Sequence, residues 1–101
     1  MIKVYVLYPE GGAFNFDYYV SSHMKMVGEL LTPMGMTDAV ATKGLGGLEP
    51  GSKPANVCIA ELTFKDMESF QKSMAAHGDK LMADLPNFTK IQPVMQINEV
   101  L

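Results

Sequence analysis

Hydrophobic and polar residues alternate first in a short segment near the start of the chain. Between Ile2 and Tyr8 the residues are mostly β-branched or aromatic, and the run ends at Pro9, a pattern typical of a β-strand. Both alternating sets, the one with Val4 and the one with Tyr5, are largely apolar. The pattern therefore predicts a central strand that is covered on both faces.

A helical period replaces this alternation over residues 16–31. Apolar side chains recur every three or four residues and form one stripe on the predicted helix, which only His23 interrupts with a polar group. Asn15 or Asp17 can cap the start of the helix, and Pro33 lies just beyond its end. The stripe consists of Phe16, Tyr19, Val20, His23, Val27, Leu30, Leu31 and Met34.

The second half of the chain repeats the order of strand and helix. Turn-forming residues are dense over residues 46–55, which we predict to be an exposed loop that tolerates substitution. After the first helix we predict a weak strand over 36–45, the loop over 46–55 and a strand over 56–64. A second helix follows, capped by Thr63 or Asp66 and broken at His77-Gly78-Asp79. A helical turn over 80–85 and a last strand over 91–100 complete the chain.

These elements follow the order β-α-β-β-α-β and fill residues 1–101 as a single domain. Two such halves with right-handed crossovers give an α+β fold, the ferredoxin-like βαββαβ sandwich, in which a four-stranded antiparallel sheet carries both helices on one face. The opposite face then needs a cover, and we expect a second copy of the sheet to provide it in a homodimer. The residues predicted on this opposite face of the sheet are Tyr5, Leu7, Val57, Ile59 and Val94.

Composition narrows the classes of function. Hydrophobic residues make up 48% of the 101 residues and charged residues 19%, which suits a packed core rather than disorder. The net charge is −3 and arginine is absent, so we expect neither nucleic acid nor a membrane as a partner. A single cysteine, Cys58, and the lack of an apolar run of membrane-spanning length indicate a cytoplasmic protein without disulfides.

Two stretches of the chain resemble signatures of the EthD family. Phe16-Asp17-Tyr18-Tyr19, followed by His23-Met24, is similar to the signature of that family's first helix. Asp84-Leu85-Pro86-Asn87-Phe88-Thr89, followed by Pro93 and Ile97-Asn98-Glu99-Val100, is similar to its C-terminal signature. The resemblance implies a dimeric α/β barrel, in which two ferredoxin-like sheets pack face to face. It also implies a role in small-molecule catabolism, because the family is named after bacterial degradation of ethyl tert-butyl ether.

His23 is the first candidate catalytic residue. Imidazole exchanges protons near neutral pH, and the apolar stripe directs His23 toward the sheet, so we expect it to line an enclosed pocket between helices and sheet. Tyr19 precedes it by four residues on the same helical face and is its candidate catalytic partner. A structural histidine, bonded to backbone or to a tyrosine, is the alternative.

Two aromatic residues are candidates for binding substrate. Tyr8 ends the first strand on the face shared with Val4 and Val6, so it can reach the same pocket, and a strand-end tyrosine with its hydroxyl in solvent is the alternative. Phe88 belongs to the C-terminal stretch that resembles EthD proteins. Nine methionines either fill the core or line a deformable apolar pocket.

The other reactive residues fit structural roles. Cys58 alternates with apolar residues in a strand, as inert core cysteines do. His77 is expected near the end of the second helix, where a histidine interacts well with the helix dipole. Only His23, His77, Asp79 and Glu61 could form a metal site, and no His-x-His or His-x-x-x-His spacing exists, so we expect no metal.

Three functions stay open. In the first, an apolar or aromatic organic compound undergoes acid–base chemistry at His23 without a cofactor, as in an isomerase, a cyclase or a monooxygenase. In the second, the protein is a non-catalytic accessory that binds such a compound, or a partner enzyme, in a degradation pathway. In the third, the protein handles haem, with His23 as an axial ligand. The fold does not select among them, because relatives of all these kinds share it.

Overall fold

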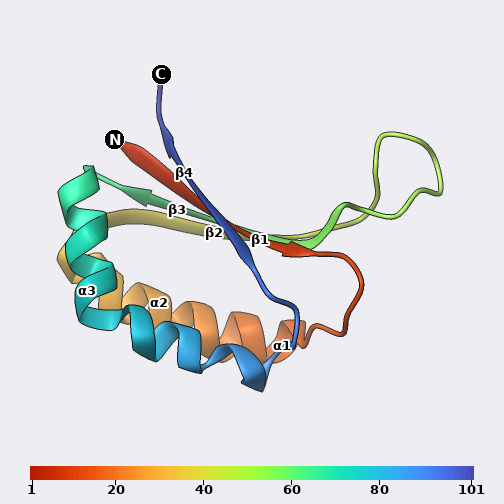
Figure 1. Cartoon of the computed structure of the whole chain (residues 1–101), viewed down its shortest axis with the longest axis horizontal. Helices are drawn as coiled ribbons and strands as arrows, with labels where there is room; N and C mark the ends of the chain where they lie inside the picture. Colours follow the sequence, from red (N-terminus) through yellow and green to blue (C-terminus); the bar gives the residue numbers. More distant parts are fainter.

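The computed structural model describes residues 1–101, and its elements follow the predicted order (Figure 1). None of its helices is long and apolar enough to cross a membrane. The strands are β1 (Ile2–Pro9), β2 (Met36–Lys43), β3 (Asn56–Phe64) and β4 (Val94–Glu99). The helical elements are α1 (Phe16–Tyr18), η1 (Tyr19–His23), α2 (Met24–Leu31), η2 (Thr32–Met34), α3 (Met67–Ala83) and η3 (Leu85–Asn87).

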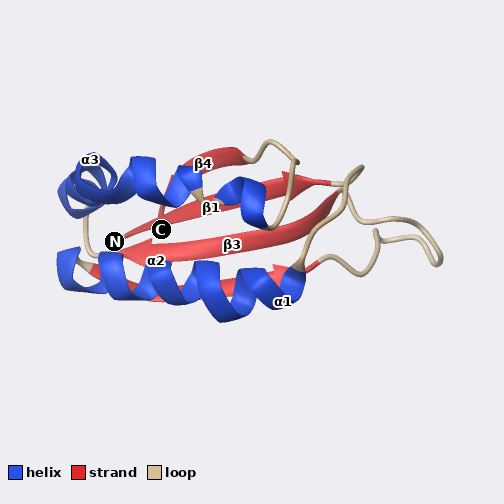
Figure 2. Cartoon of the chain, turned by 90° about the horizontal axis from the view of Figure 1, so that it is seen from below, coloured by secondary structure: helices blue, strands red, loops and turns tan.

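The four strands form one antiparallel sheet in the order β2-β3-β1-β4. Val4 in β1 lies opposite Leu62 of β3 on one side and Ile97 of β4 on the other, which confirms β1 as a central strand. Both helices pack on one face of the sheet, with α2 beside α3 (Figures 1 and 2). The predicted ferredoxin-like α+β sandwich is confirmed.

Apolar side chains from both layers meet between the sheet and the helices. Val4, Leu31 and Phe64 have no exposed surface at all, and they form the centre of the larger core cluster. A second, aromatic cluster lies where β1 ends and the first helix begins; its buried members are Tyr8, Tyr19, Cys58 and Phe88. Burial of this apolar surface is the main force that holds the helical layer on the sheet.

The first helical segment is not one regular α-helix. Asn15, rather than Asp17, caps it, since the Asn15 side chain accepts the Tyr18 backbone N–H at 3.1 Å. A π-helical turn, η1, then interrupts the segment before α2. The segment ends at Gly35, whose φ of 111° lies in the left-handed region that favours glycine.

The predicted break of the second helix at His77-Gly78-Asp79 is wrong. α3 runs without interruption from Met67 to Ala83, because packing of the helix against the sheet outweighs the roughly 1 kcal/mol that a glycine costs inside it. His77 therefore lies within the helix instead of near its end. Of the two candidate caps, Asp66 is the one used, and its side chain accepts the Ser69 backbone N–H at 2.8 Å.

The strands β2 and β4 are shorter than predicted. β2 ends at Lys43, two residues before the predicted end. β4 begins at Val94, just after Pro93, and proline cannot donate to a strand ladder because it lacks a backbone N–H. The segment before β4 instead joins the site described below.

The sheet face opposite the helices has no cover within the chain. Leu7 and Ile59 are half-buried there, and Val94 is 54% exposed. Lys3 and Glu61 form an ion pair on the same face. A mixed apolar surface of this kind on a sheet is open to pairing with another molecule.

The 44–55 segment between β2 and β3 projects away from the rest of the molecule (Figure 1). Leu45 and Leu48 are fully exposed, at 92% and 102%, so the predicted exposure of this loop is confirmed. Its base is tight, because a Cβ added to Gly44 would lie 2.1 Å from the carbonyl oxygen of Asn56.

We predict that the tip and the base of this loop differ in their tolerance of substitution. Replacing Leu48 and Glu49 together by serine should change the free energy of unfolding by less than about 1 kcal/mol, since neither side chain packs against the fold. Gly44→Ala should destabilise the protein clearly, because the added carbon collides with backbone. Urea denaturation checks both variants, and equal losses would contradict the prediction.

Candidate functional site

Aromatic rings from three distant parts of the chain meet at one end of the sheet. Tyr8 comes from the end of β1, Tyr19 from η1 and Phe88 from the segment after η3. The ring centroids of Tyr8 and Tyr19 are 5.9 Å apart, and those of Tyr19 and Phe88 are 5.0 Å apart, both with edge-to-face geometry. The Asn15 backbone N–H donates to the Phe88 carbonyl at 2.8 Å. The first helix and the segment after α3 are thereby held together.

The π-helical turn places His23 directly beside Tyr19. In this turn the Met24 backbone N–H donates to the Tyr19 carbonyl, five residues back. The two rings stack with centroids 5.5 Å apart and planes 17° from parallel. Single π turns within α-helices are rare and often mark functional sites.

One ring nitrogen of His23 is engaged by a partly buried carboxylate. Nδ1 of His23 lies 2.9 Å from Oδ2 of Asp84, and the two side chains are 7% and 14% exposed. An ionised carboxylate only accepts hydrogen bonds, so Nδ1 carries the proton. In the neutral ring, Nε2 is then the basic nitrogen.

Asp84 also accepts hydrogen bonds from two neighbours of the histidine. The hydroxyl of Tyr18 donates to Oδ1 at 2.7 Å, and the side-chain amide of Asn87 donates to the same oxygen at 2.9 Å. Burial raises the pKa of Asp84, but the hydrogen bonds from Asn87, Tyr18 and His23 outweigh it. The net pKa of Asp84 lies below its ordinary value, so the carboxylate is charged at neutral pH.

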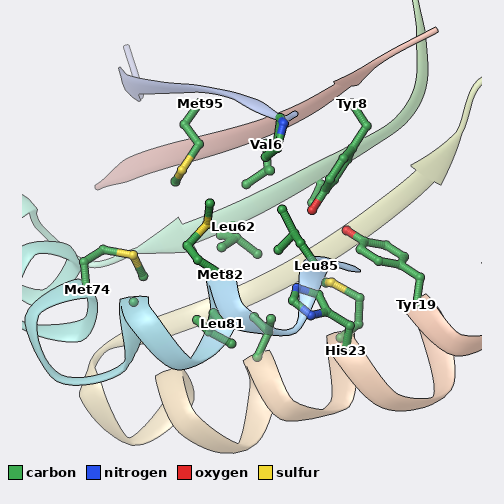
Figure 3. A pocket seen from close by; sticks show the side chains of 15 residues that line it. Val6, Tyr8, Tyr19, His23, Leu62, Met74, Leu81, Met82, Leu85 and Met95 are labelled. Carbon is green, nitrogen blue, oxygen red and sulfur yellow. The ribbon is translucent and has the colours of Figure 1, made fainter. Parts of the chain in front are cut away.

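A cavity of about 120 Å³ lies between the helices and the sheet, next to His23 (Figure 3). Its polar side chains are those of Tyr8, Tyr19 and His23. Its apolar wall includes Val6, Met24, Val27, Ala60, Leu62, Met74, Leu81, Met82, Leu85 and Met95. His23 lines a cavity between helices and sheet, as expected, but the cavity opens to the surface at one side rather than being largely enclosed. The chemical role of His23 stays a prediction.

One nitrogen of His23 is free at the wall of this cavity. No fully buried side-chain nitrogen or oxygen lacks a hydrogen-bond partner, and the ring bonds to Asp84 through Nδ1 alone. Nε2 therefore keeps some accessible surface, and His23 is one of the residues that line the cavity. A bound molecule can meet a basic nitrogen there.

Burial keeps the neighbouring phenols and the thiol protonated. Burial is the largest cause that raises the pKa of Tyr8 and of Tyr19, and the Cys58 thiol beside them adds to it. Burial likewise raises the pKa of Cys58, which fits the predicted inert core cysteine. Both tyrosine hydroxyls therefore keep their protons at neutral pH.

The profile of the EthD domain matches residues 13–92 of this chain. The chain belongs to the EthD family. An EthD-like protein from Ralstonia eutropha JMP134 has 38% sequence identity and a TM-score of 0.92, with 99% of this chain and 91% of that chain covered. No protein of curated function is significantly similar to this chain.

More distant structures share the fold with this EthD protein. An ethyl tert-butyl ether (EthD) family protein from Bacillus halodurans C-125 has 22% identity and a TM-score of 0.69, with 100% of this chain and 99% of that chain covered. An antibiotic biosynthesis monooxygenase has 9% identity and a TM-score of 0.53, with 100% and 99% covered. The fold is thus that of the dimeric α/β barrels.

The structure brings three of the four predicted site residues of this EthD protein to the cavity. Tyr8 and Tyr19 are 2% and 1% exposed and line it with His23, so the solvent-facing alternative for Tyr8 is wrong. Phe88 does not line the cavity. Its ring lies 4.7 Å from that of His23 and is buried among the aromatic side chains, so it packs against the histidine. Binding of substrate by Phe88 stays a prediction.

Asp84, Tyr18 and Asn87 were not predicted as site residues. All three belong to the stretches that resemble EthD signatures, yet nothing local indicates a chemical role for them. Asp84 is separated from His23 by 61 positions, so only the folded chain reveals the pair. Membership of both residues in those stretches was the one available signal.

The cavity does not fit haem. Its volume of about 120 Å³ is below the roughly 300–1,000 Å³ of pockets that hold drug-sized molecules. The His23 ring is also packed against the rings of both Tyr19 and Phe88. The side chains form no cluster of three or more potential metal ligands either.

We predict that Asp84→Asn lowers the free energy of unfolding at neutral pH by about 1–3 kcal/mol, because an amide cannot accept from all three donors. The folded-state pKa of Asp84 is lower than its ordinary value of 3.8. Its stabilising contribution is therefore present above that value and lost as the pH falls through the folded-state pKa. Urea denaturation from about pH 7 to about pH 3 should show that the free energies of unfolding of the wild type and of Asp84→Asn become equal in acid.

The exposed Asp79 offers a matched control for this measurement. Asp79→Asn should follow the wild type at every pH, since its carboxylate has no recorded hydrogen bond to lose. A constant difference between wild type and Asp84→Asn down to the lowest pH would contradict the role assigned to the charge of Asp84.

Proposed function

We propose that this EthD protein binds a small apolar or aromatic organic molecule in the cavity and acts on it by acid–base chemistry at His23. The observation that carries the proposal is the Asp84–His23 pair, whose free ring nitrogen faces an apolar cavity. A histidine oriented in this way can take a proton from a bound molecule and return it. No redox cofactor is needed for such a step.

The charge of Asp84 balances the charge that His23 would gain by taking a proton. When Nε2 takes a proton, the imidazolium lies 2.9 Å from a carboxylate that is itself held by Tyr18 and Asn87. A fixed opposite charge stabilises the protonated ring more inside the protein than it would in water. The carboxylate also fixes the tautomer that leaves Nε2 free, as it does in other catalytic His–carboxylate pairs.

The size of the cavity indicates the size of the bound molecule. A dry cavity of roughly 150 Å³ binds benzene in another protein, and this one measures about 120 Å³. A molecule with one ring, or a short branched chain, therefore fits, which supports a role in small-molecule catabolism. The buried, unpaired Cys58 supports a reducing location such as the cytoplasm.

A non-catalytic binding protein is the second candidate. Three side chains, those of Tyr18, His23 and Asn87, donate hydrogen bonds to the Asp84 carboxylate. A network of this kind can have a purely structural role, which is to make the site rigid. The cavity would then hold a compound without changing it. His23→Gln separates the candidates, because glutamine can still donate to Asp84 but has no basic nitrogen.

If the binding part of the proposal holds, phenol added to the protein should shift the NMR methyl signals of the methionines that line the cavity, namely Met24, Met74, Met82 and Met95. The exposed Met67 serves as the internal reference. Ala60→Leu should abolish the shifts by filling the cavity from β3, and Ala55→Leu, at an exposed position, should leave them unchanged. Equal shifts in all three proteins would contradict binding in this cavity.

We also propose that two copies pair through the open face of the sheet. The support is the uncovered apolar surface around Leu7, Ile59 and Val94, together with membership of a fold named for its dimers. A second sheet placed there would remove this surface from water, which favours association.

Light scattering should accordingly give a mass of about twice 11.1 kDa. Ile59→Lys should shift the protein toward the monomer, because a charge at the centre of the face cannot be buried unpaired. Val20→Lys, on the exposed side of the first helix at 64% exposure, is the control and should stay dimeric. A wild-type mass of a single chain would rule out the dimer.

A further inference from the structure

Polar and apolar groups occupy opposite ends of the cavity. Tyr8, Tyr19 and His23 gather at one end, and Met74 and Met95 lie at the other (Figure 3). Met82 and Met95 are 50% and 43% exposed, so the methionine end is the mouth. A bound molecule therefore has its polar group inside and its apolar part toward the mouth.

No charged side chain of fixed sign lines this cavity. The chain has no arginine, and none of its lysines reaches the wall. An ionised carboxylate or phosphate inside would lack a partner and would keep the full cost of its dehydration. The lining therefore selects a neutral molecule.

Two hydrogen-bond donors converge at the inner end. The hydroxyls of Tyr8 and Tyr19 point toward one another (Figure 3), and in the empty cavity the Tyr19 hydroxyl interacts with that of Tyr8 and with the Cys58 thiol. A hydroxyl proton can rotate toward whatever acceptor is present. One oxygen atom of a ligand can therefore accept from both phenols.

The base lies beside these donors. The His23 ring stacks on the Tyr19 ring at 5.5 Å, and its Nε2 faces the same cavity. A ligand whose oxygen meets the hydroxyls thus presents its next atoms to Nε2. The site combines two donors for an oxygen with one base for a neighbouring atom.

We propose that the cavity takes a neutral carbonyl compound, and that His23 removes a proton from the carbon next to the carbonyl group while Tyr8 and Tyr19 hold the oxygen. The C–H bond breaks, Nε2 gains the proton, and the electron pair of that bond moves through the carbon–carbon bond to the oxygen, which becomes an enolate. Return of a proton from Nε2 to carbon regenerates a carbonyl compound. The step consumes no oxidant or reductant.

This inference rests on the proposed acid–base role of His23 and names its substrate class. The negative charge of the enolate develops at the oxygen, where fixed donors in an apolar cavity stabilise it more than water does. The burial that keeps both phenols protonated ensures that they donate. The imidazolium that forms is balanced by Asp84, so neither new charge stays without a partner.

Cyclohexanone is a suitable probe, because its single ring matches the cavity and its protons next to the carbonyl exchange only slowly without a catalyst. In heavy water the wild type should replace these protons by deuterium faster than buffer does, as followed by proton NMR. Tyr8→Phe and Tyr19→Phe should each slow this exchange by roughly 10²–10³-fold, the usual loss for one oxyanion donor. His23→Gln should return it to the buffer rate.

Tyr5→Phe is the matched control, since Tyr5 lies on the opposite face of the sheet, and it should exchange like the wild type. Methyl signals of Met82 and Met95 report binding of cyclohexanone in the same samples. Binding without faster exchange would overturn the enolate step and leave the proposed cavity ligand standing. Phenol binding without cyclohexanone binding would overturn the carbonyl class alone. Absence of both would overturn the proposed function as well.

Discussion

The partly buried carboxylate of Asp84 is the group on which the site depends. It accepts hydrogen bonds from Tyr18, just before the π turn of the first helix, from His23, the last residue of that turn, and from Asn87 in η3. These bonds join segments that the chain separates by more than sixty positions. Without the carboxylate, His23 would keep neither its tautomer nor its ring orientation, and the end of α3 would lose its tie to the first helix.

The cavity exists because a rigid group of aromatic rings keeps the two layers apart at one end. At one end the aromatic cluster of Tyr8, Tyr19 and Phe88 packs edge to face, and such contacts resist collapse. At the other end flexible methionines close the space loosely, which lets them adapt to varied apolar shapes. The space is therefore rigid where chemistry would occur and compliant where a ligand enters.

The central strand serves two surfaces at once. Successive side chains of a strand point to opposite faces, so Val4, Val6 and Tyr8 face the helices and the cavity, while Lys3, Tyr5 and Leu7 face the open side. A partner on the open side would be separated from the cavity by one layer of backbone. Pairing of two sheets would thus stiffen the strand that carries Tyr8 without touching the ligand.

Local patterns in the sequence determined the order of the elements and the apolar face on which His23 lies, because strand and helix periods are properties of neighbouring residues. The family resemblance added the fold of the dimeric α/β barrels, and both are confirmed. Whether His23 and Tyr19 perform chemistry is not decided by either.

Tertiary structure alone decided the partner of His23, the π turn and the continuity of α3 through Gly78. Each depends on contacts between residues far apart in the chain, such as Asp84 with His23 or Phe88 with Tyr19. The position of Phe88 could not be predicted from the sequence either. Its ring packs against those of Tyr19 and His23 and does not line the cavity. Spacing along a helix can say which face a residue occupies, but the group that meets it across the core is set by packing of the whole fold.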